Sequence, residues 1–187
     1  DAFGLTLFSH GIDLQTEVRS SAAHQHYLYH LLENLLLPTD PEKTPLRSTA
    51  IADNIHIMAE KMHRRSLFVI FTDALVNRQE WEPLFDSLRH LRHCKHEVIL
   101  FHTLHQPHEV NLDFGNKPCY FIDMETDRRI KVFPNEIAQR YGDEMRQRVE
   151  EVQRRAIQYN IDYIPVDVTQ GFDQILQPYL LKRSRHR

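Results

Sequence analysis

Two short apolar runs have no polar face, and they constrain the fold of this chain more than any other feature. Residues 67–71 (LFVIF) and 98–101 (VILF) are apolar at every position. A strand with one face in water alternates apolar and polar residues, whereas a strand buried between two helical layers does not. We therefore expect both runs to be central strands of a mostly parallel sheet that helices cover on both faces.

Strand and helix patterns alternate around these runs along the whole chain. The helix that ends before Pro38 has a leucine-rich face and is expected to cover a sheet, and another helix is expected to start near Pro83. Besides the two runs, strands are expected at residues 2–9, 12–18, 119–124, 129–133 and 162–168, and helices at 21–37, 48–65, 81–92, 134–159 and 171–183. This order predicts a single domain over residues 1–187 with a three-layer α/β fold.

Composition excludes several classes of function. The 187 residues are 41% hydrophobic and 26% charged, as in an ordinary globular protein. The five glycines form neither a GxGxxG nor a GxxxxGK[ST] pattern, which excludes those nucleotide-binding motifs. A net charge of −3 provides no basic field for nucleic acid, and the longest apolar runs are too short to span a bilayer. Because Cys94 and Cys119 form no CxxC site or disulfide framework, we expect a reducing, cytoplasmic location.

Residues that follow the expected parallel strands are the first candidates for a ligand site, because ligands bind at the carboxyl ends of such strands. Asp73 ends the segment SLFVIFTD, and Thr49 opens the preceding helix. A carboxylate and a hydroxyl, completed by waters, are oxygen ligands of the kind that Mg²⁺ prefers. In the alternative interpretation Asp73 caps a helix or lies in a loop, Thr49 is an ordinary helix residue, and Thr44 competes with it.

Potential metal ligands of another kind follow the second apolar run: His102, His105, His108 and Glu109. Their spacing is compatible with zinc, and together with Asp73 this segment supports an alternative function, a metal-assisted hydrolase. No HExxH motif occurs and Pro107 argues against a regular helix, so the competing interpretation is a solvated loop. A second histidine cluster is interpreted as a basic helix end: His90, His93 and His96.

Four segments occur in a characteristic order: RRSLFVIFTD at 64–73, LRHCKHEVILFHTLHQPHE at 91–109, FIDMET at 121–126 and QGFDQILQPYLLKR at 170–183. Over nearly the whole chain this set resembles the family known as domain of unknown function 58. That family is similar to von Willebrand factor A domains, which implies a Rossmann-like sheet with a metal-ion-dependent adhesion site at the strand ends. Its association with MoxR-type AAA+ ATPases implies a role in the assembly or maturation of other proteins.

The resemblance assigns part of that adhesion site to this sequence. Asp73 matches its late aspartate and Thr49 its threonine, whereas the DxSxS element that follows the family's first strand has no match. We therefore expect the chain to lack that strand, to hold no cofactor by itself, and to bind Mg²⁺ only within a longer protein that carries the element.

Together these inferences predict a non-enzymatic module that binds protein partners near Asp73 and Thr49, with a MoxR-type AAA+ ATPase as the expected partner. They predict binding neither to nucleic acid nor to a membrane. A missing strand would leave a sheet edge unpaired, and we therefore also expect self-association.

Overall fold

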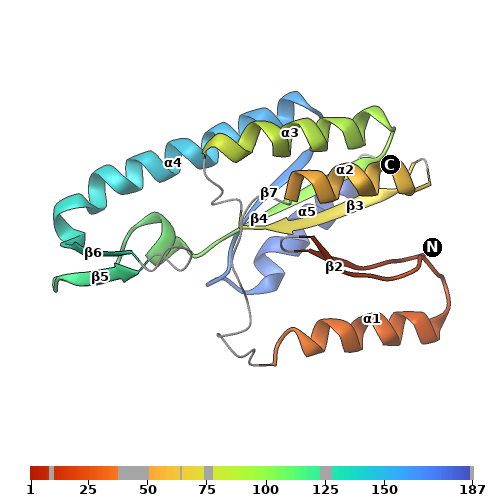
Figure 1. Cartoon of the computed structure of the whole chain (residues 1–187), viewed down its shortest axis with the longest axis horizontal. Coiled ribbons are helices and arrows are strands. Elements are labelled where there is room, and N and C mark those ends of the chain that lie inside the picture. The colour runs from red at the N-terminus through yellow and green to blue at the C-terminus, as the bar shows by residue number, and fades with distance from the viewer. Residues whose placement is uncertain (9–10, 38–50, 64, 74–77, 123–127, 186–187) are drawn as a thin grey trace.

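A parallel sheet of three strands forms the centre of the protein (Figure 1). The strands are β3 (Leu67–Thr72), β4 (Glu97–Leu104) and β7 (Asp162–Asp167), in the order β3-β4-β7. The computed structural model describes residues 1–8, 11–37, 51–63, 65–73, 78–122 and 128–185. A parallel sheet whose strands are joined through helices confirms the α/β fold class.

Three helices cover one face of this sheet: α2 (Ile51–Lys61), α3 (Arg78–His93) and α4 (Pro134–Gln158). Alternate residues of β3 and β4 point into the core beneath them, because successive side chains of a strand lie on opposite faces. The core joins all three helices to the strands through Ile55, Ala59, Phe68, Ile70, Trp81, Leu84, Phe85, Leu88, Leu91, Val98, Leu100, Val152, Ala156 and Ile161.

The opposite face of the sheet is covered over β4 but not over β3. Ile99 and Phe101 of β4 are buried, and the Tyr179 ring of helix α5 (Phe172–Arg185) meets Phe101 edge-on at 6.0 Å. In β3, by contrast, the side chains of Leu67, Val69 and Phe71 are 46%, 45% and 65% exposed. The expectation of a central strand covered on both faces therefore holds for the 98–101 run. It is wrong for residues 67–71, because β3 is an edge strand and one of its two faces is largely exposed.

The N-terminal strands form a small sheet of their own, apart from the parallel sheet (Figure 1). Strands β1 (Thr6–Phe8) and β2 (Ile12–Gln15) pair antiparallel in a two-stranded sheet, and helix α1 (Ala22–Asn34) follows. Ser21 caps this helix by accepting the His24 backbone N–H at 3.2 Å. His24 is the one buried residue of α1, and Tyr27 and Leu32 on the apolar face are exposed. The helix was predicted correctly, but the expectation that its leucine-rich face covers a sheet is wrong.

The remaining elements follow the sequence pattern with some shifted boundaries, among them the end of α2 at Lys61 instead of residue 65. Strands β5 (Cys119–Ile122) and β6 (Arg129–Val132) pair antiparallel, as expected of a hairpin, and α4 begins at Pro134 as predicted. Helix α3 begins at Arg78 rather than near Pro83, so the proline lies inside the helix. Its ring removes one backbone hydrogen bond, and the Pro83 carbonyl accepts the Ser87 hydroxyl at 3.0 Å.

Candidate functional site at the carboxyl end of the sheet

The three parallel strands end at one edge of the sheet and bring chemically active residues together there. Thr72 of β3 lies opposite His102 of β4, and Leu104 of β4 lies opposite Asp167 of β7. Asp73 follows β3 directly and is exposed, so its carboxylate faces solvent at this edge, where the sequence predicts a ligand site. Thr49 and its competitor Thr44 lie outside the described residues.

His102 is the most buried ionisable group at this edge, with 3% of its surface exposed. Its Nε2 lies 3.0 Å from the Asp73 carbonyl oxygen, and its Nδ1 lies 2.7 Å from the Tyr163 hydroxyl. A carbonyl only accepts hydrogen bonds, so Nε2 carries the proton and Nδ1 accepts from Tyr163. Burial lowers the pKa of His102 and raises that of Tyr163, which keeps both groups neutral. Because both ring nitrogens are hydrogen-bonded, His102 links β4 to β7 and to the end of β3.

Acidification is expected to destabilise the protein through His102. Because burial lowers the pKa of this imidazole below its ordinary 6.5 in the folded state, the unfolded chain binds the proton first. The stability that neutral His102 contributes is therefore present above pH 6.5 and is lost as the pH falls through the folded-state pKa. Between about pH 7.5 and 5, the Tm of the wild type should fall more than the Tm of His102→Gln. Parallel pH profiles would contradict this role.

The segment after β4 folds into one π-helical turn, η2 (Gln106–Val110). Glu109 accepts the His105 backbone N–H at 2.7 Å, and His105 Nδ1 accepts the His108 backbone N–H at 3.2 Å. The His105 and His108 rings stack at 4.4 Å. The solvated-loop interpretation is thus wrong for His102, which is buried, and for His105, which caps the turn. Within the described residues, this segment does not bring three metal-ligand atoms within 4.8 Å of one another.

A cavity of about 420 Å³ lies between β7 and α5, next to the same edge. Asp167 lines it, and its carboxylate accepts the Thr169 backbone N–H at 3.1 Å and the Thr169 hydroxyl at 2.8 Å. The Gln170 amide donates to the same carboxylate at 3.3 Å. These hydrogen bonds, those from Thr169 first, lower the pKa of Asp167. Asp167 is a site residue that was not predicted, although its place at the carboxyl end of the third parallel strand could have indicated it.

The second histidine cluster is only partly the basic helix end that was expected. His90 and His93 lie in the last turn of α3. His96 instead follows the helix in the interior, 1% exposed, where its Nδ1 accepts the Ser66 backbone N–H at 3.3 Å. The Phe68 ring meets it edge-on at 5.0 Å. His96 therefore belongs to the packing between β3 and β4 and not to the solvated surface.

Two broader observations bear on the class of protein. None of the helices in the described ranges is long and apolar enough to cross a membrane. The α/β class rests on the parallel sheet and the helices that flank it. Comparison with family models, with curated proteins and with solved structures finds no match for this chain.

Proposed function

We propose that this chain is a non-enzymatic protein-interaction module of the von Willebrand factor A kind, whose partner binds at β3 and the adjoining Asp73. The proposal rests on the exposed face and the unpaired outer edge of β3 among the described residues. Its residues Leu67, Val69 and Phe71 form an exposed apolar face, and no described strand pairs with its outer edge. An edge strand with an apolar face is suited to bind another polypeptide, because backbone hydrogen bonds supply affinity and side-chain contacts supply specificity.

The resemblance to domain of unknown function 58 supports a MoxR-type AAA+ ATPase as the partner. In this proposal the partner contacts the apolar face of β3 and the Asp73 carboxylate lies beside that contact. In this proposal Mg²⁺ binds only in a longer protein that carries a DxSxS element, because Asp73 and Thr49 alone offer one carboxylate and one hydroxyl. The same exposed face would also serve self-association when no other partner is present.

The hydrolase alternative has less support from the geometry. Both ring nitrogens of His102 are hydrogen-bonded, so the ring is neither a free base nor a free ligand. Glu109 and His105 are engaged within their own turn. The exposed carboxylate of Asp73 therefore lacks a partner of known catalytic type among these residues, which favours recognition over turnover.

Replacing Phe71 by aspartate is expected to weaken binding to the purified MoxR-type ATPase of the source organism at least about tenfold. A charge in the middle of an apolar contact must be desolvated, and aromatic anchors dominate such contacts. The matched control is Tyr120→Asp, since Tyr120 is 67% exposed on the distant β5–β6 hairpin and Phe71 is 65% exposed (Figure 1).

Surface plasmon resonance gives the affinities, and sedimentation velocity shows whether each protein self-associates. Equal affinity for wild type, Phe71→Asp and Tyr120→Asp would reject β3 as the binding surface. Absence of any binding by the wild type would reject this ATPase as the partner. A dimer that only Phe71→Asp converts to a monomer would assign the exposed face to a second copy of the chain.

A further inference from the structure

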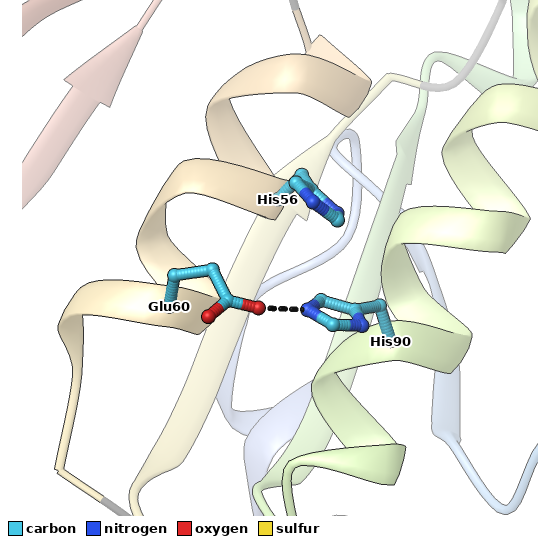
Figure 2. Close-up of side chains that lie close together, drawn as sticks. All are labelled: His56, Glu60 and His90. Carbon is cyan, nitrogen blue, oxygen red and sulfur yellow. Dashed lines mark hydrogen bonds and ion pairs between the residues drawn. The ribbon is translucent and has the colours of Figure 1, made fainter.

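Helices α2 and α3 bring three side chains of the types that can bind a metal together on the surface, away from the carboxyl end of the sheet. His56 and Glu60 are one turn apart on α2, and His90 faces them from α3 (Figure 2). One ligand atom of each residue lies within 4.8 Å of the others. Residues four apart on a helix lie on the same face, which explains why His56 and Glu60 both reach His90.

The distances within this group are close to those of a coordination sphere. Glu60 Oε1 lies 2.6 Å from His90 Nε2, and the rings of His56 and His90 stack with their centroids 4.4 Å apart. Cys94 directly follows the last residue of α3, four positions after His90, and its Sγ lies 3.7 Å from His90 Nε2. The sequence thus pairs a His-x₃-Glu pattern on α2 with a His-x₃-Cys pattern at the end of α3.

The packing beneath these side chains fixes the spacing of the two helices. The Ser87 hydroxyl of α3 donates to the Ala52 carbonyl of α2 at 2.8 Å, and Ile55, Ala59 and Leu88 lie in the shared core. The side chains of His90 and Glu60 are 26% and 63% exposed, so an ion can reach them from solvent. A surface cavity of about 400 Å³ adjoins the group, lined by His56, Asp86, Ser87, Arg89, His90 and His93.

We propose that His56, Glu60, His90 and Cys94 bind a zinc ion that fastens α2 to α3. Imidazole nitrogen, carboxylate oxygen and thiolate sulfur form the ligand set that zinc prefers, whereas Mg²⁺ prefers oxygen alone. Zinc–ligand bonds of about 2.0–2.3 Å place the ligands of a tetrahedral ion roughly 3.3–3.8 Å apart. The separation between Cys94 and His90 already falls in this range. Two side chains have to move for this. Glu60 gives up its hydrogen bond to His90 and moves outward, which its exposure allows, and Cys94, which lies outside the group of ligand atoms within 4.8 Å of one another, turns toward the ion.

This site is independent of the proposed partner-binding surface. Its ligands lie on α2 and α3, and neither Asp73 nor any residue of β3 takes part. In the simpler interpretation the Glu60–His90 hydrogen bond and the stacked rings hold the two helices together without a metal. Glu60→Gln separates the two interpretations, because a glutamine keeps a hydrogen bond to His90 but is a much poorer zinc ligand.

The test is a zinc titration of the whole chain under reducing conditions, in competition with a chromophoric chelator. The wild type is expected to bind one zinc ion tightly, and Glu60→Gln, His56→Gln and His90→Gln are expected to bind it at least about tenfold more weakly. His93→Gln is the matched control, because His93 lines the adjoining cavity but is not a proposed ligand. Circular dichroism establishes that each variant is folded.

Cobalt in place of zinc tests the thiolate ligand directly. The wild type should show tetrahedral d–d absorption and a thiolate charge-transfer band, and Cys94→Ser should lose that band and bind the metal more weakly. An unchanged spectrum in Cys94→Ser would overturn the four-ligand site. Failure of the wild type to bind zinc tightly would overturn the proposal, as would equal zinc affinity of Glu60→Gln, His93→Gln and wild type.

Discussion

Replacing Leu100 by alanine is expected to lower the free energy of unfolding by about 2–5 kcal/mol. Leu100 is 1% exposed in the central strand β4 and belongs to the core beneath α2, α3 and α4. The substitution removes apolar contact area and leaves a cavity that the surrounding helices fill only in part. Urea denaturation, followed by circular dichroism, measures the loss.

The matched control for this prediction is Leu67→Ala in the neighbouring strand. Leu67 is 46% exposed on the open face of β3, so its truncation should cost less than about 1 kcal/mol. A similar loss in both variants would mean that β3 is covered on both faces in solution. The pair of variants therefore tests the central finding of one-sided burial in β3 as well as the core itself.

Replacing His102 by alanine is expected to lower the free energy of unfolding by about 2–4 kcal/mol. The change leaves a cavity between β4 and β7 and removes the acceptor of the Tyr163 hydroxyl, which is 2.7 Å away in the wild type. An unpaired, partly buried hydroxyl adds a desolvation cost to that of the cavity.

A double-mutant cycle with Tyr163→Phe isolates the hydrogen bond from the cavity. In the Tyr163→Phe background, His102→Ala should lower the free energy of unfolding by less than it does in the wild type. The expected coupling energy is about 0.5–3 kcal/mol. Strictly additive losses would contradict the link between the two side chains. His108→Ala is the comparison at an exposed position and should change stability by less than about 1 kcal/mol.

The sequence was sufficient to predict the α/β class, the strands and most helix boundaries, because these depend on local periodicity. The same pattern could not distinguish β3 from β4. Both runs are apolar on two faces, but the position of a strand in the sheet order depends on which strands pair with it. The leucine-rich face of α1 shows the same limit, since its periodicity predicts a helix but not what the helix packs against.

The residues of the candidate sites also fall into two groups: those that the local sequence indicates and those that only the fold brings together. Asp73 could be predicted because a residue that follows a parallel strand lies at the sheet edge wherever that strand pairs. The partnership of His102 with Tyr163 joins residues 61 positions apart, and no local pattern indicates it. The spacing of His56 and Glu60 was visible in the sequence, but their significance depends on His90, which only the packing of α3 against α2 brings within reach.

The order β3-β4-β7 also has a kinetic consequence. Pairing of Leu67 with Glu97 joins residues 30 positions apart, whereas pairing of Ile99 with Asp162 joins residues 63 positions apart. Since each doubling of a closed loop costs about 0.6 kcal/mol of chain entropy, we expect the β3–α3–β4 unit to form before β7 is added. The 25-residue helix α4 occupies much of the longer connection, so we expect the rate at which β7 joins the sheet to depend on the formation of that helix.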